Sequence, residues 1–258
     1  MKNSKNISLL ILALISLGLG SCQKETSPSD LTLTVSQDRS IGHLGDTIPL
    51  TIKASTSKDK ITSITITKTG GKSVTIPAIS SKTNYSQVIN YIVNDSVGTL
   101  VFTISANAAN LTSPIVKTLT FSIVKDVEIT LGASSSLLPS FINGSTLKTY
   151  NASEAAASQA SIDLLYKYTT SDGAVIGSPS DPTFSLTSWT TKNVTKIAKI
   201  MDETPDAVSM VTGTSVKNLT KGDMLGYITS GGVNGIIEVM DITVGVNGNC
   251  TFTFMVIK

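Results

Sequence analysis

Three acidic side chains that lie close together in the sequence could bind a metal ion. Asp202, Glu203 and Asp206 fall within one short segment, and hard cations such as calcium prefer carboxylate oxygens as ligands. A structural alternative stays open. Thr204 followed by Pro205 is typical of a helix N-cap and first turn, where nearby carboxylates offset the helix dipole. The sequence therefore predicts either a calcium site or an acidic helix start.

A small group of aromatic residues could bind sugar. Trp189, Tyr166 and Tyr168 are candidates for a platform on which a glycan ring stacks. Tyr166 and Tyr168 are two residues apart, so both would lie on one face of a strand, which is also the pattern of core residues. The sequence favours core packing and keeps glycan binding as the functional alternative.

Residues that commonly carry catalysis are scarce. The chain has one histidine and two cysteines among 258 residues, which excludes most His-dependent triads and most His/Cys metal sites. His43, in a glycine-rich turn, is expected to be a solvated loop residue. Cys250 alternates with Phe252 and Phe254, which predicts a buried, unreactive thiol. With no glycine-rich phosphate loop or nucleophile elbow in view, we expect no cofactor and no enzymatic activity.

The N-terminus has the features of a secretion signal. Lys2 and Lys5 precede an apolar run from Ile7 to Leu19 that is too short to span a bilayer. The following Leu19-Gly20-Ser21-Cys22 resembles the lipobox of bacterial lipoproteins. The resemblance implies that residues 1–21 are removed and that Cys22 is acylated, which tethers the protein to a membrane through lipid.

Charge and the residues after Cys22 bear on location. Loss of Lys2 and Lys5 from 20 basic residues leaves 18 against 18 acidic ones, so no basic field argues for nucleic acid as a partner. Gln23 stands where some inner-membrane lipoproteins have Asp, which favours the outer membrane. The stretch from Cys22 to Glu25 resembles export signals of surface lipoproteins of the Bacteroidota, and so implies surface exposure.

Residues 22–30 read as a polar tether, and residues 31–126 as an immunoglobulin-like β-sandwich. Period-two alternation recurs there in about seven short segments separated by turn residues. Leu119, Phe121 and Ile123, for example, alternate with polar residues. The expected strands are 31–35, 47–54, 61–67, 73–77, 87–93, 99–106 and 116–124.

Residues 127–258 read as a second, mainly β domain with short helices. Asn151 and Glu154 form a capping-box pattern, and a helix is expected to start after Thr204 and to close at Gly213. Helical spacing predicts another short helix over 193–201. Strands are expected at 162–168, 224–228, 235–244 and 250–257, the last two joined by a turn at Asn247-Gly248.

Two further resemblances concern the Bacteroidota. Tyr166, Tyr168, the segment 178–182 and the segment 189–196 resemble a domain that recurs over about residues 150–258 in uncharacterised lipoproteins of these bacteria. The tripeptides starting at Asp46 and Asp95 resemble their O-glycosylation sequon. That resemblance implies modification at Thr47 and Ser96.

These observations predict a non-catalytic outer-membrane lipoprotein in which the first domain presents a distal binding domain. Its partner would be a glycan or another envelope protein, besides the membrane itself. Two alternatives stay open. One is a fimbrial or structural subunit that assembles by β-strand addition, and the other is a hydrolase whose site forms only in the fold.

Overall fold

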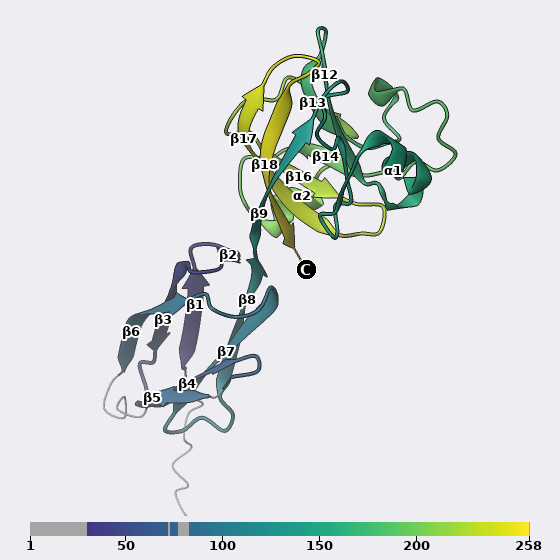
Figure 1. The fold of residues 1–258 in the computed structure, drawn as a ribbon. Coiled ribbons are helices and arrows are strands. Elements are labelled where there is room, and N and C mark those ends of the chain that lie inside the picture. Colours follow the sequence, from purple (N-terminus) through teal and green to yellow (C-terminus); the bar gives the residue numbers. More distant parts are fainter. Residues whose placement is uncertain (1–29, 72, 77–82, 258) are drawn as a thin grey trace, which may run out of the picture.

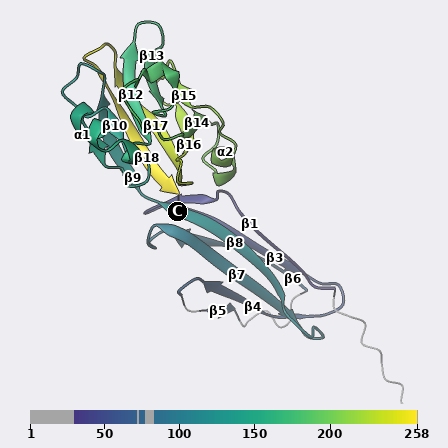
Figure 2. The same ribbon diagram turned by 90° about the vertical axis from the view of Figure 1, so that its right-hand side faces the viewer.

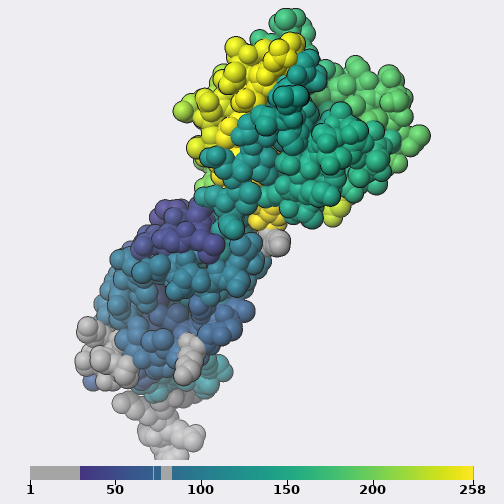
Figure 3. Space-filling model, in the orientation of Figure 1, coloured from purple at the N-terminus to yellow at the C-terminus, as the bar shows by residue number. Residues whose placement is uncertain are grey.

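The computed structural model describes residues 30–71, 73–76 and 83–257. The fold is mainly β, as the sequence predicts, and its strands form four sheets. No sheet mixes strands from before and after Lys125, the one residue between β8 (Ile115–Val124) and β9 (Asp126–Gly132). Two lobes follow one another along the long axis of the molecule (Figures 1 and 3).

The first lobe is an immunoglobulin-like sandwich. A three-stranded sheet, β1-β3-β6, packs on a five-stranded sheet, β2-β8-β7-β4-β5, in which β2 runs parallel to β8 (Figure 2). Alternate residues of each long strand point inward and form a shared apolar core. The remaining bounds are β1 (Thr32–Gln37), β2 (Ile41–His43), β3 (Thr47–Ser55), β4 (Ile61–Lys68), β5 (Val74–Ile76), β6 (Asn84–Ile92) and β7 (Gly98–Ala108).

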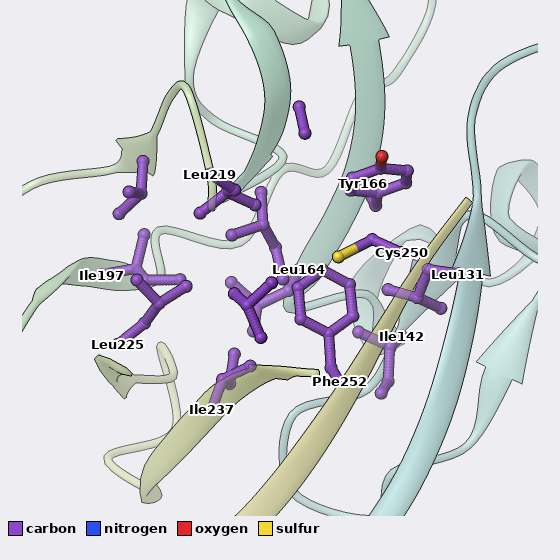
Figure 4. Packing of buried hydrophobic residues seen from close by; sticks show 14 of the residues in the cluster. Leu131, Ile142, Leu164, Tyr166, Ile197, Leu219, Leu225, Ile237, Cys250 and Phe252 are labelled. Carbon is purple, nitrogen blue, oxygen red and sulfur yellow. The ribbon is translucent and has the colours of Figure 1, made fainter. Parts of the chain in front are cut away.

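The second lobe packs two five-stranded sheets around its own core. Their orders are β11-β10-β12-β13-β15 and β14-β16-β17-β18-β9. Leu164, Tyr166 and Phe252 belong to the core between them (Figure 4). The strands are β10 (Phe141–Ile142), β11 (Thr149–Tyr150), β12 (Leu164–Thr169), β13 (Gly173–Gly177), β14 (Lys196–Lys199), β15 (Ser215–Val216), β16 (Met224–Ile228), β17 (Asn234–Thr243) and β18 (Asn249–Ile257).

Short helices cover the second lobe. α1 (Ala152–Ala157) starts at the predicted capping box, in which Asn151 and Glu154 bond each other's backbone. The 3-10 turn η1 (Gln159–Ser161) follows α1 directly. α1 and the 3-10 turn η2 (Pro182–Phe184) contribute to a separate apolar cluster with residues of β10, β12 and β13. α2 (Pro205–Ser209) starts at Thr204 as predicted, but it ends at Met210 rather than at Gly213.

Two segments differ from the structure that the sequence predicts. The helix expected over 193–201 is the edge strand β14, which pairs with β16. A strand of four residues is too short for a helical period to be diagnostic, and among the apolar residues of 193–201 only Ile197 is fully buried, while Met201 is exposed. The turn around Gly42 contains β2, because Ile41, Gly42 and His43 pair with the end of β8.

Candidate functional site

The structure separates the three aromatic residues predicted to form a platform. Tyr166 is buried between the two sheets of the second lobe, with its ring edge-to-face against Phe252 at 5.9 Å, and Tyr168 packs against the same core. Trp189 lies over the outer face of one of those sheets, stacked on Phe141 at 5.6 Å. The expected three-residue platform is therefore not formed, because a β-sheet stands between its members.

The acidic cluster does not gather either. Among the described residues, no group of three or more His, Cys, Asp or Glu side chains is placed to hold a metal ion. Thr204 caps α2 by accepting from the backbone N–H of Ala207, with Asp206 in the first turn. Glu203 turns away to His43. The expected calcium site is replaced by the structural alternative, an acidic helix start.

His43 occupies a position that the sequence did not indicate. Its Nδ1 lies 2.7 Å from Asp126 Oδ1, and its Nε2 lies 3.2 Å from Glu203 Oε1. Asp126 opens the second lobe and Glu203 precedes α2, so one imidazole of the first lobe bridges two carboxylates of the second. The hydrogen bond to Glu203, reinforced by Asp126, outweighs partial burial and raises the pKa of His43 to about 9.

Apolar residues from both lobes form a second contact, here called the junction core. Ile41 and Val124 from the first lobe meet side chains from the outer face of β17 and β18 and from α2. The buried contributors of the second lobe are Val208, Ile236, Met255 and Ile257. The lobes are thus joined by a one-residue link, a small core and a charged bridge.

The residue predicted to carry the lipid lies outside the described part of the chain, whereas the two predicted glycosylation positions and the second cysteine lie within it. Cys22 precedes the first described residue. Thr47 is exposed at the start of β3, and Ser96 is exposed between β6 and β7. Cys250 is buried in the second lobe (Figure 4), and burial raises the pKa of its thiol to about 12, as expected of an unreactive core residue.

The second lobe also carries a shallow surface depression, here called the α1–η1 depression. Its lining is entirely uncharged and consists of small, hydroxyl and amide side chains: Ala156, Ala157, Ser158, Gln159, Ala160, Ser161, Thr190 and Thr191. Trp189 directly precedes this lining in sequence and is half-buried. The sequence indicates Trp189 as a candidate but carries no signal for η1, to which its loop is bonded.

The rim of the depression is held by two side-chain amides. Gln159 Oε1 accepts hydrogen bonds from the backbone N–H groups of Thr190 and Thr191, at 2.9 and 3.0 Å. Asn193 adds a second tie by donating to the carbonyl of Ala160 at 3.0 Å. The loop that carries Trp189 is therefore tied to η1 by these hydrogen bonds.

Comparison with known proteins adds little. No protein-family model and no curated protein matches the chain. Among solved structures it is similar to the CARDB domain of a Pyrococcus furiosus protein, crystallised in complex with di-metal ions, at 14% identity and a TM-score of 0.30. That match covers 38% of this chain and 90% of the other. A score this low carries no argument about function. Within the described residues, no helix combines the length and apolar character needed to cross a membrane.

Proposed function

We propose that this protein is a lipid-anchored lipoprotein of the outer membrane that presents a glycan-binding domain at the cell surface and catalyses no reaction. Acylation at Cys22 would provide the anchor, the first lobe would act as a spacer, and the α1–η1 depression of the second lobe would take the ligand. The observation that carries the proposal is the placement of this neutral depression on the lobe farther from the tether.

The path of the chain supports this placement. Asp30, the first described residue, accepts hydrogen bonds from the backbone N–H of Ser57 and from the hydroxyls of Thr56 and Ser57. Ser57 follows the end of β3, whereas β3 begins near the junction with the second lobe. The chain therefore enters at the pole opposite the junction, and a membrane tether at that pole directs the second lobe away from the membrane.

The junction supports presentation in a fixed direction. A one-residue link limits the relative rotation of the lobes, and the junction core and the His43 bridge restrict it further. A flexible spacer would need a longer polar linker, such as a Gly/Ser-rich one. The second lobe is therefore held at a defined angle to the first.

The lining of the depression favours a neutral, hydroxyl-rich ligand. Uncharged hydroxyl and amide groups can exchange hydrogen bonds with sugar hydroxyls, and a neighbouring indole offers an apolar face. An anionic ligand would call for a basic residue in the lining, and none is present there. A neutral glycan thus fits better than an acidic one.

Metabolic labelling tests the anchor. We expect radiolabelled palmitate to mark the wild-type chain and not the Cys22→Ser variant, which should leave the membrane fraction. For orientation, Leu137→Cys places a thiol on a fully exposed side chain of the second lobe. Because Cys250 is buried, a membrane-impermeant maleimide applied to intact cells should label this protein only at the new thiol. Absence of palmitate labelling, or of maleimide labelling on intact cells, contradicts the corresponding part of the proposal.

A glycan array with purified protein tests the ligand. Thr191→Arg should block the depression and abolish binding to neutral glycans, while Ser171→Arg on a hairpin of the same lobe should leave it unchanged. Trp189→Ala should weaken binding by about 1 kcal/mol or more if the indole stacks on a sugar, and its melting temperature reports any loss of packing on Phe141. Equal binding by the two arginine variants would show that glycans do not bind at the α1–η1 depression.

A further inference from the structure

We propose that the outer edge of β6 is a docking site for an extended strand of another polypeptide. Among the strands that the structure describes, β6 pairs with β3 on one side only. A strand edge presents a row of backbone N–H and C=O groups that another chain can pair with. The edge of β6 is nine residues long.

Among the residues that the structure describes, the other sheet edges have features that protect them from added strands, and β6 has none. β2, β5, β11 and β15 are two or three residues long. β14 carries Lys196 and Lys199, and β9 carries Asp126 and Glu128. The chain after β1 crosses to the other sheet as β2, which closes that side of the sandwich. β6 has no charged residue and no proline, and it pairs with β3 over nine positions without a bulge. Short length, charge, proline and bulges are the devices that protect natural edges.

The side chains around this edge indicate what the added strand would look like. Tyr85, Ile89 and Tyr91 point toward the core but stay only half-buried, and Ile66 and Ile76 on the opposite sheet are likewise partly exposed. A new strand beside β6 would lay alternate side chains over this apolar rim. An uncharged segment with apolar residues at every second position therefore fits.

The outward face of β6 agrees with an uncharged partner. Val88 and Ile92 are 56% and 59% exposed, and Asn84, Ser86 and Asn90 complete this row. Cross-strand neighbours of this kind gain from β-branched and hydroxyl partners and gain nothing from charges. The partner strand is accordingly rich in Val, Ile and Thr.

A second copy of this chain fits less well than a foreign strand. Symmetric pairing of two β6 edges is antiparallel, so it would point the two molecules in opposite directions and place one tether at each end. This step rests on the proposed anchoring, because two copies in one membrane need their tethers at the same end. Residues 22–30 are a poor donor strand since they contain Pro28 and charges at Lys24 and Glu25.

The test uses the soluble Cys22→Ser protein and a fluorescent peptide of nine alternating Thr and Val residues. We expect saturable binding and slower hydrogen exchange at alternate backbone amides of β6. The double variant Ser86→Lys/Asn90→Lys introduces edge lysines at exposed positions and should weaken binding about tenfold. The matched control Thr34→Lys/Ser36→Lys adds the same charge to β1 on the same face and should bind like wild type.

Several outcomes would overturn the proposal. Unchanged β6 exchange in the presence of peptide, or equal loss of binding in both double variants, would show that the edge does not accept a strand. Slow exchange of all β6 amides without peptide would show that the edge is already covered. Dimers or polymer ladders that disappear in the β6 variant would make the partner a second copy instead. None of these results depends on palmitate labelling, so failure of the anchor and failure of the edge remain distinguishable.

Discussion

At the scale of single residues, the main departure from the sequence prediction is His43. A histidine between two glycines suggests a solvated turn, and nothing in the local sequence points to partners 83 and 160 positions away. In the fold, the Asp126 carboxylate pairs with Nδ1 of the ring and the Glu203 carboxylate pairs with Nε2, and the His43 side chain is only 21% exposed. The residue becomes a cationic bridge between the lobes because the fold brings two distant carboxylates together.

The bridge predicts a specific pH dependence. The folded-state pKa of His43, about 9, lies above the ordinary value of 6.5. The protonated form is therefore stabilised by folding, and this contribution is fully present below about pH 6.5 and is lost as the pH rises through about 9. Because the carboxylates are partly exposed and screened, the contribution is on the order of 1 kcal/mol.

NMR titration of the imidazole protons measures this pKa directly, since His43 is the one histidine in the chain. Denaturant unfolding between pH 6 and pH 10 should show a decline for wild type that is reduced in His43→Gln. A substitution of Asp46 is the control. This carboxylate accepts hydrogen bonds from the backbone N–H of His43 and from the guanidinium of Arg39, but does not bond the imidazole ring. A titration midpoint near 6.5 would show that the bridge does not form in solution.

At the scale of elements, most strands with a clear apolar alternation were predictable, and even the short β5 lies within the expected segment 73–77, whereas β9 and β13 were not predicted. β3, β4, β7, β8, β16, β17 and β18 fall within a few residues of the expected segments because each has an inward apolar row over at least five positions. β10, β11 and β15 are two residues long, so no period can reveal them. β14 was predicted as a helix because Val194, Ile197, Ala198 and Met201 recur at helical spacing, and the pairing of this segment with β16 overrides that pattern.

The same limit applies to the candidate site. The capping-box pattern of Asn151 and Glu154 predicts the start of α1. The loop that carries Trp189 is held by Gln159, which is distant in sequence. No local pattern connects an amide in a 3-10 turn to backbone groups 31 residues away. The helix could thus be predicted, and the depression beside it could not.

The capping box gives a prediction at this scale. Asn151→Ala removes the side-chain oxygen that accepts from the backbone N–H groups of Ser153 and Glu154, so unfolding should cost about 1 kcal/mol less. Because α1 leads directly into η1, the variant should also weaken glycan binding at the α1–η1 depression. Calorimetry and the glycan array measure the two effects. Ser209→Ala, at the end of α2, is the control, and equal effects on binding would show that the cap does not position the depression.

At the scale of the whole molecule, the sequence predicted two domains but not how they meet. The junction core draws on the outward face of β17 and β18, whose inward face fills the domain interior. A strand that is apolar on both faces reads as buried within its own domain. Met255 and Ile257 instead belong to the junction core, because the outer face of their sheet borders the first lobe. This arrangement cannot be predicted from the strand sequence alone.

The junction core should set the direction in which the second lobe is presented. Val208→Ser places a hydroxyl at a fully buried position of this core, which should cost about 2 kcal/mol at the interface. Each lobe keeps its own core, so both should stay folded while their relative orientation becomes variable. Small-angle scattering should then show a broader distribution of interatomic distances, and calorimetry should resolve two melting transitions where wild type shows coupled melting. Val244→Ser, at a residue 71% exposed, should change neither. If Val208→Ser leaves both measurements unchanged, the one-residue link alone determines the angle between the lobes, and the junction core only fills space.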